Sequence, residues 1–251
     1  MRTLAVIPAR LGATRLPRKP LRLLAGLPLV VRVWQRVTGL GLFDKVIVAT
    51  DSDEVLAAVR EHGAEAFKTA EYNSGTERAA GAVLHGGYAL DFDVVVNVQG
   101  DEPFVSRQAL LGAARKVTEA GFQIGTAAVL ATPAILNDPN VVKVVTTDRG
   151  RAMYFSRAPI PFLRDPSDAE LQRSNIYQHI GVYAYDMATL LGWHSLPESP
   201  LEQIERLEQL RPLAAGVEIG VALIDEPVRP GIDTESDLER ANRDWTAFTI
   251  G

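Results

Sequence analysis

Residues 94–103 read Val-Val-Val-Asn-Val-Gln-Gly-Asp-Glu-Pro, an apolar run that ends in polar residues around a glycine. So nearly continuous an apolar run predicts a strand over residues 94–98 that belongs to a parallel sheet and is covered on both faces. Shorter runs predict further strands over residues 4–7, 45–49 and 64–67, with helical patterns between them. This alternation predicts an α/β fold with a doubly wound, mostly parallel sheet and right-handed crossovers.

The segments between these strands have the apolar spacing of helices. Helices are expected over residues 28–40, from residue 52, over residues 76–90 and from residue 106 to about residue 120. The second and fourth begin at a serine, a residue type that caps helix N-termini. Ligands of such sheets bind beyond the carboxyl ends of the strands. We therefore expect the chemistry in the loops that follow residues 7, 49 and 98.

The second half of the chain has a different pattern. Strands of a mixed or antiparallel layer are expected over residues 141–147, 151–155 and 177–185, followed by a helix over 200–210, a strand over 217–224 and a closing helix over 234–248. No repeat, linker or low-complexity segment divides the chain. The sequence therefore predicts one domain over residues 1–251, in which residues from about 133 to 185 contribute a smaller, mixed-sheet sub-lobe.

The composition indicates an ordinary globular protein and excludes several classes of function. Of the 251 residues, 47% are hydrophobic and 23% are charged, and the net charge is -5. An acidic chain of this size is a poor general nucleic-acid binder, because affinity for the phosphate backbone needs a basic face. The absence of cysteine excludes disulfides, thiolate metal sites and cysteine nucleophiles. No apolar run approaches the ~18 residues of a membrane span or resembles a signal peptide. We therefore expect a cytoplasmic protein without a nucleic-acid or membrane partner.

The loop after the first strand is rich in cations. It reads Pro-Ala-Arg-Leu-Gly-Ala-Thr-Arg-Leu-Pro-Arg-Lys-Pro over residues 8–20 and includes Arg10, Arg15, Arg18 and Lys19. Guanidinium groups make forked contacts to phosphate oxygens, and small residues let backbone N–H groups approach an anion. The loop therefore predicts a triphosphate site, and the alternative is a solvated basic loop. It matches neither the Walker A motif nor the dinucleotide fingerprint.

Two carboxylates are expected to meet that loop. Asp101 follows a glycine at the carboxyl end of a strand, and Asp233 follows a Pro-Gly turn at a helix entrance. Thr234 and Asp237 have a spacing like that of a capping box for the last helix. Taken singly, Asp101 is as readily a turn-capping residue and Asp233 a helix-end charge. Together with the basic loop, the pair predicts two Mg²⁺ ligands and a phosphate clamp, the minimum for nucleotidyl transfer.

Six motifs occur in order along the chain and together resemble one family. They are Ile7-Pro8-Ala9-Arg10, residues 14–21, Ala49-Thr50-Asp51, residues 74–78 (Ser-Gly-Thr-Glu-Arg), residues 97–103 and Gly231-Ile232-Asp233-Thr234. Shorter matches at residues 155–158, 179–183, 199–202 and 207–211 extend the resemblance over about residues 3–243. The chain is similar to the 3-deoxy-manno-octulosonate cytidylyltransferases, whose fold is of the nucleotide-diphospho-sugar transferase type.

The resemblance implies a role for each matching residue. It assigns CTP binding to Pro8, Ala9, Arg10, Arg15, Lys19, Asp51, Ser74, Gly75 and Arg78. It assigns the sugar acid to Gln99, Arg157, His179, Tyr183, Glu202 and Glu208, and Mg²⁺ to Asp101 and Asp233. The catalytic set is then Arg10, Arg15, Lys19, Asp101 and Asp233. For His179 and Tyr183 the alternative is a packing role. Glu202 and Glu208, six residues apart on one expected helix, cannot share a turn face.

The resemblance further implies a Mg²⁺-dependent enzyme that joins 3-deoxy-D-manno-octulosonate (Kdo) to CMP from CTP, releases pyrophosphate and serves lipopolysaccharide biosynthesis. One alternative is CMP transfer to another sugar acid, such as an 8-amino variant of Kdo or a nonulosonic acid. Another is a catalytically inactive nucleotide-binding regulator. A homodimer is also implied, with the sub-lobe contributing to dimerisation and sugar binding. Residues 158–163 (Ala-Pro-Ile-Pro-Phe-Leu) are apolar, and their two prolines make them unsuited to a central strand.

Two positions depart from the family pattern. The family commonly has a histidine where Tyr72 stands and a glycine where Arg18 stands. Tyr72 alters a detail of the loop on the nucleotide side. Arg18 either adds charge near the phosphates or points outward.

Overall fold

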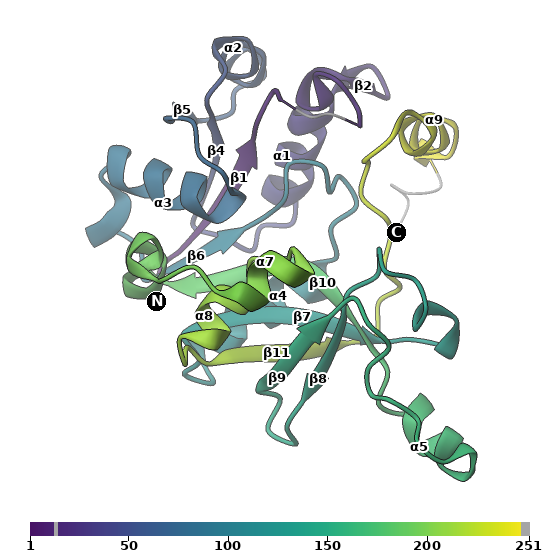
Figure 1. Cartoon of the computed structure of the whole chain (residues 1–251). Helices are drawn as coiled ribbons and strands as arrows, with labels where there is room; N and C mark the ends of the chain where they lie inside the picture. The colour runs from purple at the N-terminus through teal and green to yellow at the C-terminus, as the bar shows by residue number, and fades with distance from the viewer. Residues whose placement is uncertain (13–14, 247–251) are drawn as a thin grey trace. The chain divides into compact units, whose positions relative to one another are not determined.

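Two compact units make up the chain (Figure 1). The computed structural model describes residues 1–12 and 15–246. The first unit comprises residues 1–107 and the C-terminal segment from Arg229, and the second comprises residues 108–228. The segment expected as a sub-lobe lies inside the second unit. Within the described residues, no helix is long and apolar enough to cross a membrane.

The first unit contains four parallel strands in the order β6-β1-β4-β5. They are β1 (Thr3–Ala9), β4 (Lys45–Thr50), β5 (Ala66–Lys68) and β6 (Val94–Asn97). The chain runs outward from β1 through β4 to β5 and then returns to the other side of β1 with β6. The loops after β1 and β6 therefore begin at neighbouring strand ends, on opposite sides of which the chain continues in different directions. Ligands bind at such a point in sheets of this kind. The predicted α/β fold with a mostly parallel sheet is confirmed.

Helices connect these strands. They are α1 (Leu29–Gly39), α2 (Asp53–Glu61) and α3 (Gly75–His85), and a further helix of this unit, α9 (Glu235–Arg243), follows the last strand. Ser52 caps α2 by accepting a hydrogen bond from the Val55 amide at 3.4 Å, and Ser74 caps α3 through the Glu77 amide at 3.1 Å. α3 ends before the expected residue 90, because Gly87 has a left-handed φ of 70°, which glycine adopts readily and a helix does not contain.

A buried cluster joins the loop after β1 to the C-terminal helix. Its members are Leu16, Leu24, Leu29, Ile232, Leu238 and Ala241, with Phe104 and Trp245 packed against them. The short hairpin of β2 (Leu23–Leu24) and β3 (Leu27–Pro28) contributes to it. Leu16 and Ile232 are each 1% exposed. Because Leu16 belongs to the basic loop and Ile232 precedes Asp233, burial of the cluster holds the basic loop beside that carboxylate.

The strands of the second unit run in mixed directions (Figure 1). Its strands are β7 (Ile124–Leu130), β8 (Lys143–Thr146), β9 (Ala152–Ser156), β10 (Tyr177–Asp186) and β11 (Ile219–Ile224). β7 pairs parallel with β11 and antiparallel with β10, and β8 pairs antiparallel with both β9 and β10. The helices are α4 (Arg107–Thr118), α5 (Ala169–Arg173), α6 (Met187–Leu191), α7 (Pro200–Glu205) and α8 (Leu210–Ala214).

Short 3₁₀ turns complete the two units. They span Lys19–Leu21, Tyr88–Leu90, Pro133–Ile135, Pro166–Asp168 and Trp193–Ser195.

Strand β7 was not predicted, although it pairs on both sides. Its sequence, Ile-Gly-Thr-Ala-Ala-Val-Leu, consists mostly of small residues and lacks the alternation of an ordinary strand. A β-carbon at Gly125 would lie 2.0 Å from the carbonyl oxygen of Ala113 in α4. Glycine is therefore required at position 125, where α4 packs directly on the strand, and the small residues of this strand give it a weak strand pattern in the sequence.

Two predicted helices differ from the structure. The helix expected over residues 200–210 is divided into α7 and α8, because Arg206 has left-handed angles of φ 54° and ψ 46°. The closing helix, expected over 234–248, ends at Arg243, and residues 247–248 of that prediction lie outside the described residues. The other predicted strands and helices are present, with ends shifted by a few residues.

Candidate functional site

A pocket of about 350 Å³ opens in the first unit at the carboxyl ends of β1 and β6. Its walls come from the loop after β1, the start of α3, the loop after β6 and the segment before α9. The lining residues are Pro8, Ala9, Arg10, Arg15, Leu16, Lys19, Pro20, Tyr72, Asn73, Ser74, Gly75, Arg78, Gln99, Gly100, Asp101 and Asp233. They include both predicted Mg²⁺ ligands and every residue predicted to bind CTP except Asp51.

Two glycines let the walls of the pocket approach one another. A β-carbon at Gly100 would lie 2.6 Å from the carbonyl oxygen of Pro8, so glycine is needed for the loop after β6 to come this close to the loop after β1. A β-carbon at Gly231 would lie 2.9 Å from a carboxylate oxygen of Glu102. These close approaches bring the two acidic loops together at the basic loop.

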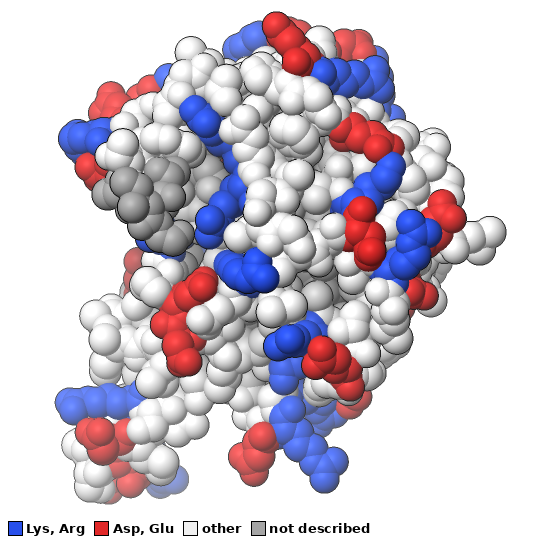
Figure 2. Space-filling view, turned by 180° about the vertical axis from the view of Figure 1, so that it is seen from behind, with Lys and Arg blue, Asp and Glu red and all other residues white. Residues whose placement is uncertain are grey.

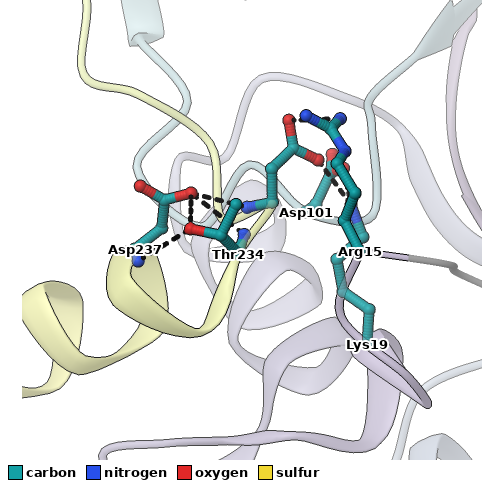
Figure 3. A network of polar contacts seen from close by, with 6 residues as sticks. Arg15, Lys19, Asp101, Thr234 and Asp237 are labelled. Atoms are coloured by element: carbon teal, nitrogen blue, oxygen red, sulfur yellow. Dashed lines mark hydrogen bonds and ion pairs between the residues drawn. The ribbon is translucent and has the colours of Figure 1, made fainter.

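Two cations of the loop after β1 meet two carboxylates in this pocket (Figure 3). The Lys19 ammonium donates to Asp101 Oδ2 at 2.5 Å and to Asp233 Oδ1 at 2.9 Å. The Arg15 guanidinium lies 3.1 Å from the other carboxylate oxygen of Asp233. The Lys19 side chain is only 17% exposed, so its contacts are partly shielded from water. Carboxylates from two separate loops therefore converge on one cation.

The charges around this cation shift two pKa values. Burial of the Lys19 ammonium lowers its pKa, but the charge of Asp101 and the hydrogen bonds to Asp101 and Asp233 outweigh burial and raise the pKa above its usual value. Burial, followed by the charges of Asp101 and Asp233, raises the pKa of Glu102 to about 8, and Lys19 opposes that rise. Negative charge is thus concentrated here, and a further cation would be stabilised.

The capping box of α9 holds the main chain of Asp233. Thr234 Oγ1 accepts from the Asp237 amide at 3.2 Å, and Asp237 Oδ2 accepts from the Thr234 amide at 3.0 Å, which confirms the expected cap. The same carboxylate oxygen accepts from the Asp233 amide at 3.3 Å. The Asp233 main chain is therefore fixed by the helix start, while its side chain meets Arg15 and Lys19.

Arg78 organises the wall that α3 provides. Its guanidinium, in a residue that is 2% exposed, donates to Asp51 Oδ2 at 2.6 Å, to Thr69 Oγ1 at 2.7 Å and to the Ala70 carbonyl at 3.3 Å. Asp51 therefore contacts Arg78 and is not itself among the residues that line the pocket. These bonds hold the loop that precedes α3 against the first turns of the helix.

The donor set of the site fits a magnesium ion whose shell is completed by substrate. Among residues 1–12 and 15–246, no group of three or more His, Cys, Asp or Glu side chains could hold a metal ion. Two carboxylates do converge on the Lys19 ammonium, which stands where a cation is favoured. Mg²⁺ is usually bound by one or two carboxylates, with water and substrate phosphates as its other ligands. Asp101 and Asp233 meet that requirement.

The other predicted sugar-site residues, apart from Gln99, lie in the second unit, where Arg157 is bonded to main chain. Its guanidinium donates to the carbonyl oxygens of Glu205 and Pro139, both at 2.8 Å. The Arg157 amide and the Ser156 hydroxyl donate to the Glu205 carboxylate at 2.9 Å and 2.6 Å. Arg157 thus joins the end of β9 to the end of α7, and a bound carboxylate would have to share this guanidinium with the main chain.

Glu202 and Glu208 are separated by the break between α7 and α8 and have different surroundings. Glu202 accepts two hydrogen bonds from the Arg211 guanidinium, both at 2.8 Å. Burial, followed by the charges of Tyr185 and Glu208, raises the pKa of Tyr183 well above its usual value. The charge of Glu208 therefore acts on Tyr183, whereas Glu202, through its bonds to Arg211, connects α7 to α8.

His179 belongs to a row of rings. Its ring centroid lies 5.0 Å from that of Phe155 and 5.4 Å from that of Tyr183, and Nε2 lies 2.9 Å from Thr126 Oγ1. Burial lowers the pKa of His179 to about 3, so the imidazole is neutral near pH 7. These contacts suit the packing role that was the alternative for this histidine, and they also leave a neutral imidazole available for hydrogen bonding.

The two departures from the family pattern have different consequences. Arg18 has a left-handed φ of 58°, a conformation that glycine adopts without strain. Its side chain is 57% exposed and pairs with Glu54, so Arg18 points outward and is not among the residues that line the pocket. Tyr72 does line the pocket, and its ring lies against Gly81 of α3.

Two residues with unusual environments were not predicted as part of the site. Glu102 contacts the Gly231 segment and has the raised pKa described above. Asn97 is 1% exposed, and neither its amide nitrogen nor its amide oxygen has a hydrogen-bond partner among the described residues, which is rare for a buried side chain. An amide inside an apolar run is a signal visible in the sequence, whereas the environment of Glu102 depends on the approach of two distant loops.

Known proteins are similar to this chain over nearly all of its length. The family model described as cytidylyltransferase matches residues 4–219. A 3-deoxy-manno-octulosonate cytidylyltransferase of Gemmatimonas aurantiaca is 57% identical over 246 residues, which cover 98% of this chain and 95% of that protein. A protein of the same description from Leptothrix cholodnii is 46% identical, with 95% of this chain and 89% of that protein covered.

Solved structures agree with the fold. A CMP:2-keto-3-deoxy-manno-octonic acid synthetase complexed with CTP has a TM-score of 0.89 and 34% identity, and the match covers 98% of this chain and 99% of that one. A 4-diphosphocytidyl-2C-methyl-D-erythritol synthase from Anaerococcus prevotii has a TM-score of 0.61 at 14% identity, with 98% of both chains covered. The second similarity concerns the fold alone.

Proposed function

This chain belongs to the cytidylyltransferase family, with 3-deoxy-manno-octulosonate cytidylyltransferases among its relatives, and on that premise we propose that it transfers CMP from CTP to Kdo and releases pyrophosphate. The observation that carries the proposal is the convergence of Arg15, Lys19, Asp101 and Asp233 from three separate loops in one pocket. Cations for the phosphates and carboxylates for a metal ion are what nucleotidyl transfer needs together.

In the proposed reaction, the C2 hydroxyl of Kdo attacks the α-phosphorus of CTP. The bond from the α-phosphorus to the bridging oxygen breaks, pyrophosphate leaves with the bonding electrons, and the hydroxyl proton is released to solvent. Arg10, Arg15 and Lys19 would hold the phosphates and neutralise the charge that develops on the leaving group. Lys19 is bonded to two carboxylates, so its ammonium would have to give up at least one of these bonds in order to contact a phosphate oxygen. The chain itself would contribute alignment and charge neutralisation.

Mg²⁺ dependence is part of the proposal, with Asp101 and Asp233 as the ligands. Bound there, Mg²⁺ would stabilise phosphate charge and lower the pKa of the attacking hydroxyl. The support is the donor set: two carboxylates converge on one cation and raise the pKa of a neighbouring carboxyl group. Calorimetric titration of Mg²⁺ into the protein with a nonhydrolysable CTP analogue, in wild type and Asp101→Asn, tests this assignment apart from turnover. Equal Mg²⁺ affinity in the two proteins would show that Asp101 is not a Mg²⁺ ligand.

The sugar acid is proposed to contact Gln99 together with Arg157, His179, Tyr183, Glu202 and Glu208. Gln99 lines the nucleotide pocket, so it is positioned to meet a group bound next to the α-phosphate. Kdo is favoured over an 8-amino variant or a nonulosonic acid, because relatives at 57% and 46% identity are described by that substrate. The product CMP-Kdo would serve lipopolysaccharide biosynthesis. The intact charged network argues against an inactive nucleotide-binding regulator.

The proposal includes a homodimer formed through residues 158–163. Phe162 is 81% exposed and Leu171, in the following helix, is 67% exposed. Large apolar side chains of this kind contribute roughly 1.5–3 kcal/mol each when fully buried. Sedimentation equilibrium of wild type and a Phe162→Asp, Leu163→Asp double variant tests the dimer. A wild type that is monomeric at micromolar concentration, or a double variant whose dimer is undisturbed, would rule it out.

We also propose a cytoplasmic enzyme that works without a nucleic-acid or membrane partner. The net charge is -5, and acidic and basic side chains lie next to one another on the face shown in Figure 2. Binding to a phosphate backbone requires an extended basic surface, and acidic side chains stand beside basic ones over much of that face.

Pyrophosphate release in the presence of CTP and Mg²⁺ tests the proposed function. The acceptors are Kdo, its 8-amino variant, a nonulosonic acid and no acceptor. We expect release to depend on an acceptor and to be fastest with Kdo, and we expect CTP to be preferred over ATP because a site that hydrogen-bonds one base leaves polar groups unpaired with another. Faster pyrophosphate release with another sugar acid would identify that sugar acid, and not Kdo, as the preferred substrate. No release with any acceptor would overturn the proposal.

A further inference from the structure

Tyr72 forms a wall of the nucleotide pocket and rests on a glycine of α3. It stands just before the helix, is half-buried and lines the pocket together with Asn73 and Ser74. A β-carbon at Gly81 would lie 2.6 Å from both Cε2 and the hydroxyl oxygen of Tyr72. Non-bonded atoms do not approach so closely, so the ring occupies a place on the helix that is open only because residue 81 has no side chain.

The spacing of residues along α3 shows that this place belongs to the pocket side of the helix. Ser74, Arg78 and Gly81 follow one another at i, i+4 and i+7 and therefore share one helix face. Ser74 and Arg78 both line the pocket. Gly81 continues that face beyond Arg78, and it is buried. The Tyr72 ring thus lies between the helix on one side and the pocket on the other.

The loop that carries Tyr72 is fixed on both sides of this residue. Before it, Arg78 donates to Thr69 and Ala70 at 2.7 Å and 3.3 Å. After it, the Asn73 amide donates to a carboxylate oxygen of Glu77 at 3.1 Å. The main chain is held by these bonds and the ring is held by the helix, so contacts within the protein fix the position of the aromatic surface.

We propose that Tyr72, seated on Gly81, is the aromatic wall of the base subsite and restricts this subsite to a pyrimidine nucleotide. An aromatic ring offers a heterocyclic base a surface for stacking, and the bulk of the tyrosine occupies volume that the second ring of a purine would need. The histidine that the family commonly has at this position is smaller. The inference rests on the proposed CTP site and identifies the residue by which this chain selects the base.

The close contact at position 81 allows an experiment that separates ring placement from general damage. Gly81→Ala puts a methyl group where the ring lies, and alanine is more favourable than glycine inside a helix, so the variant is expected to fold with the ring displaced toward the pocket. Dissociation constants would be measured by calorimetry in wild type, Gly81→Ala, Tyr72→Ala and the double variant. The ligands are CTP, ATP and tripolyphosphate. Tripolyphosphate has no base and reports on the phosphate-binding loop alone.

Gly86→Ala is the matched control, because it creates the same kind of contact away from the pocket. A β-carbon at Gly86 would lie 2.6 Å from the ring of Tyr88, which is not among the residues that line the pocket. This control is expected to bind CTP with the affinity of wild type. A loss of CTP affinity in Gly86→Ala as large as that in Gly81→Ala would overturn the inference.

We expect Gly81→Ala to weaken CTP binding about three- to tenfold when Tyr72 is present and by less than about twofold in the Tyr72→Ala background. Tyr72→Ala itself should weaken CTP binding by a similar factor and narrow the preference for CTP over ATP, with tripolyphosphate affinity unchanged in every variant. The inference is overturned if Tyr72→Ala binds CTP as wild type does, or if Gly81→Ala has the same effect with and without the ring. A wild type that binds tripolyphosphate but not CTP would instead refute the proposed function.

Discussion

Replacement of Lys19 by methionine is expected to weaken both the fold and the reaction. The ammonium makes charged hydrogen bonds of 2.5 Å to Asp101 and 2.9 Å to Asp233, and bonds of this kind contribute about 1.5–3 kcal/mol each. The two carboxylate side chains keep 28% and 44% of their exposure, so water compensates for part of the loss. We therefore expect the free energy of unfolding to fall by roughly 1–2 kcal/mol.

Catalysis should suffer more than stability in Lys19→Met. Loss of one group that stabilises charge in the transition state lowers kcat by about 10²–10³-fold. The variant also leaves Asp101 and Asp233 without their shared cation, so Mg²⁺ should raise its Tm more than it raises that of wild type. The measurements are urea denaturation, steady-state pyrophosphate release and thermal melting with and without Mg²⁺.

Arg18→Gly is the matched control, because it removes a cation from the same loop. Arg18 pairs with the exposed Glu54, and its φ of 58° suits glycine. We expect this control to keep kcat/KM within about twofold of wild type, since exposed ion pairs contribute little. The reasoning is refuted if Lys19→Met keeps the activity of wild type, or if the two variants lose activity equally.

Three further changes test other residues. Asp101→Asn should abolish pyrophosphate release at saturating Mg²⁺ while the circular dichroism spectrum stays that of wild type; near-normal turnover would show that the residue is not needed as a metal ligand. Asn97→Leu should raise the free energy of unfolding by about 1–2 kcal/mol, because neither polar atom of Asn97 has a partner among the described residues; a lower urea midpoint would contradict this. Burial lowers the pKa of His179 from 6.5 to about 3, so between those values the unfolded state binds a proton that the folded state does not. The free energy of unfolding of wild type should therefore fall as the pH drops below 6.5, by up to about 1.4 kcal/mol per pH unit. It should fall less steeply in His179→Gln. If the free energy of unfolding depends on pH in the same way in both proteins, His179 is not the group responsible.

Much of the pocket could be predicted because its lining residues stand in short motifs at the ends of strands. The parallel order of β1 and β6 brings the loops after these strands to one edge of the sheet, so neighbours in space could be inferred without knowing side-chain positions. The approach of Asp233 was less apparent, because it depends on the buried cluster around Leu16 and Ile232. The sequence shows the charges, but the packing of this cluster determines which of them meet.

The features that could not be predicted depend on contacts between distant residues. β7 consists mostly of small residues, one of which, Gly125, is required by the packing of α4, so its apolar pattern is weak. The break at Arg206 places a non-glycine residue in a left-handed conformation, against its local preference. Arg157 was predicted to bind a carboxylate, but its guanidinium also donates to main-chain carbonyl groups of Glu205 and Pro139, which no local pattern indicates. In each case tertiary packing determines the structure more than the local sequence does.

The transfer of CMP to Kdo is tested most directly by ³¹P NMR of the protein with CTP, Mg²⁺ and Kdo. As the three CTP resonances decline, we expect pyrophosphate and a phosphodiester resonance from CMP-Kdo to appear in equal molar amounts, and neither should form when Kdo is omitted. An unchanged CTP spectrum in the complete mixture would contradict the proposed activity. So would pyrophosphate that accumulates together with free CMP and without the phosphodiester, because that result would indicate hydrolysis and not transfer to the sugar.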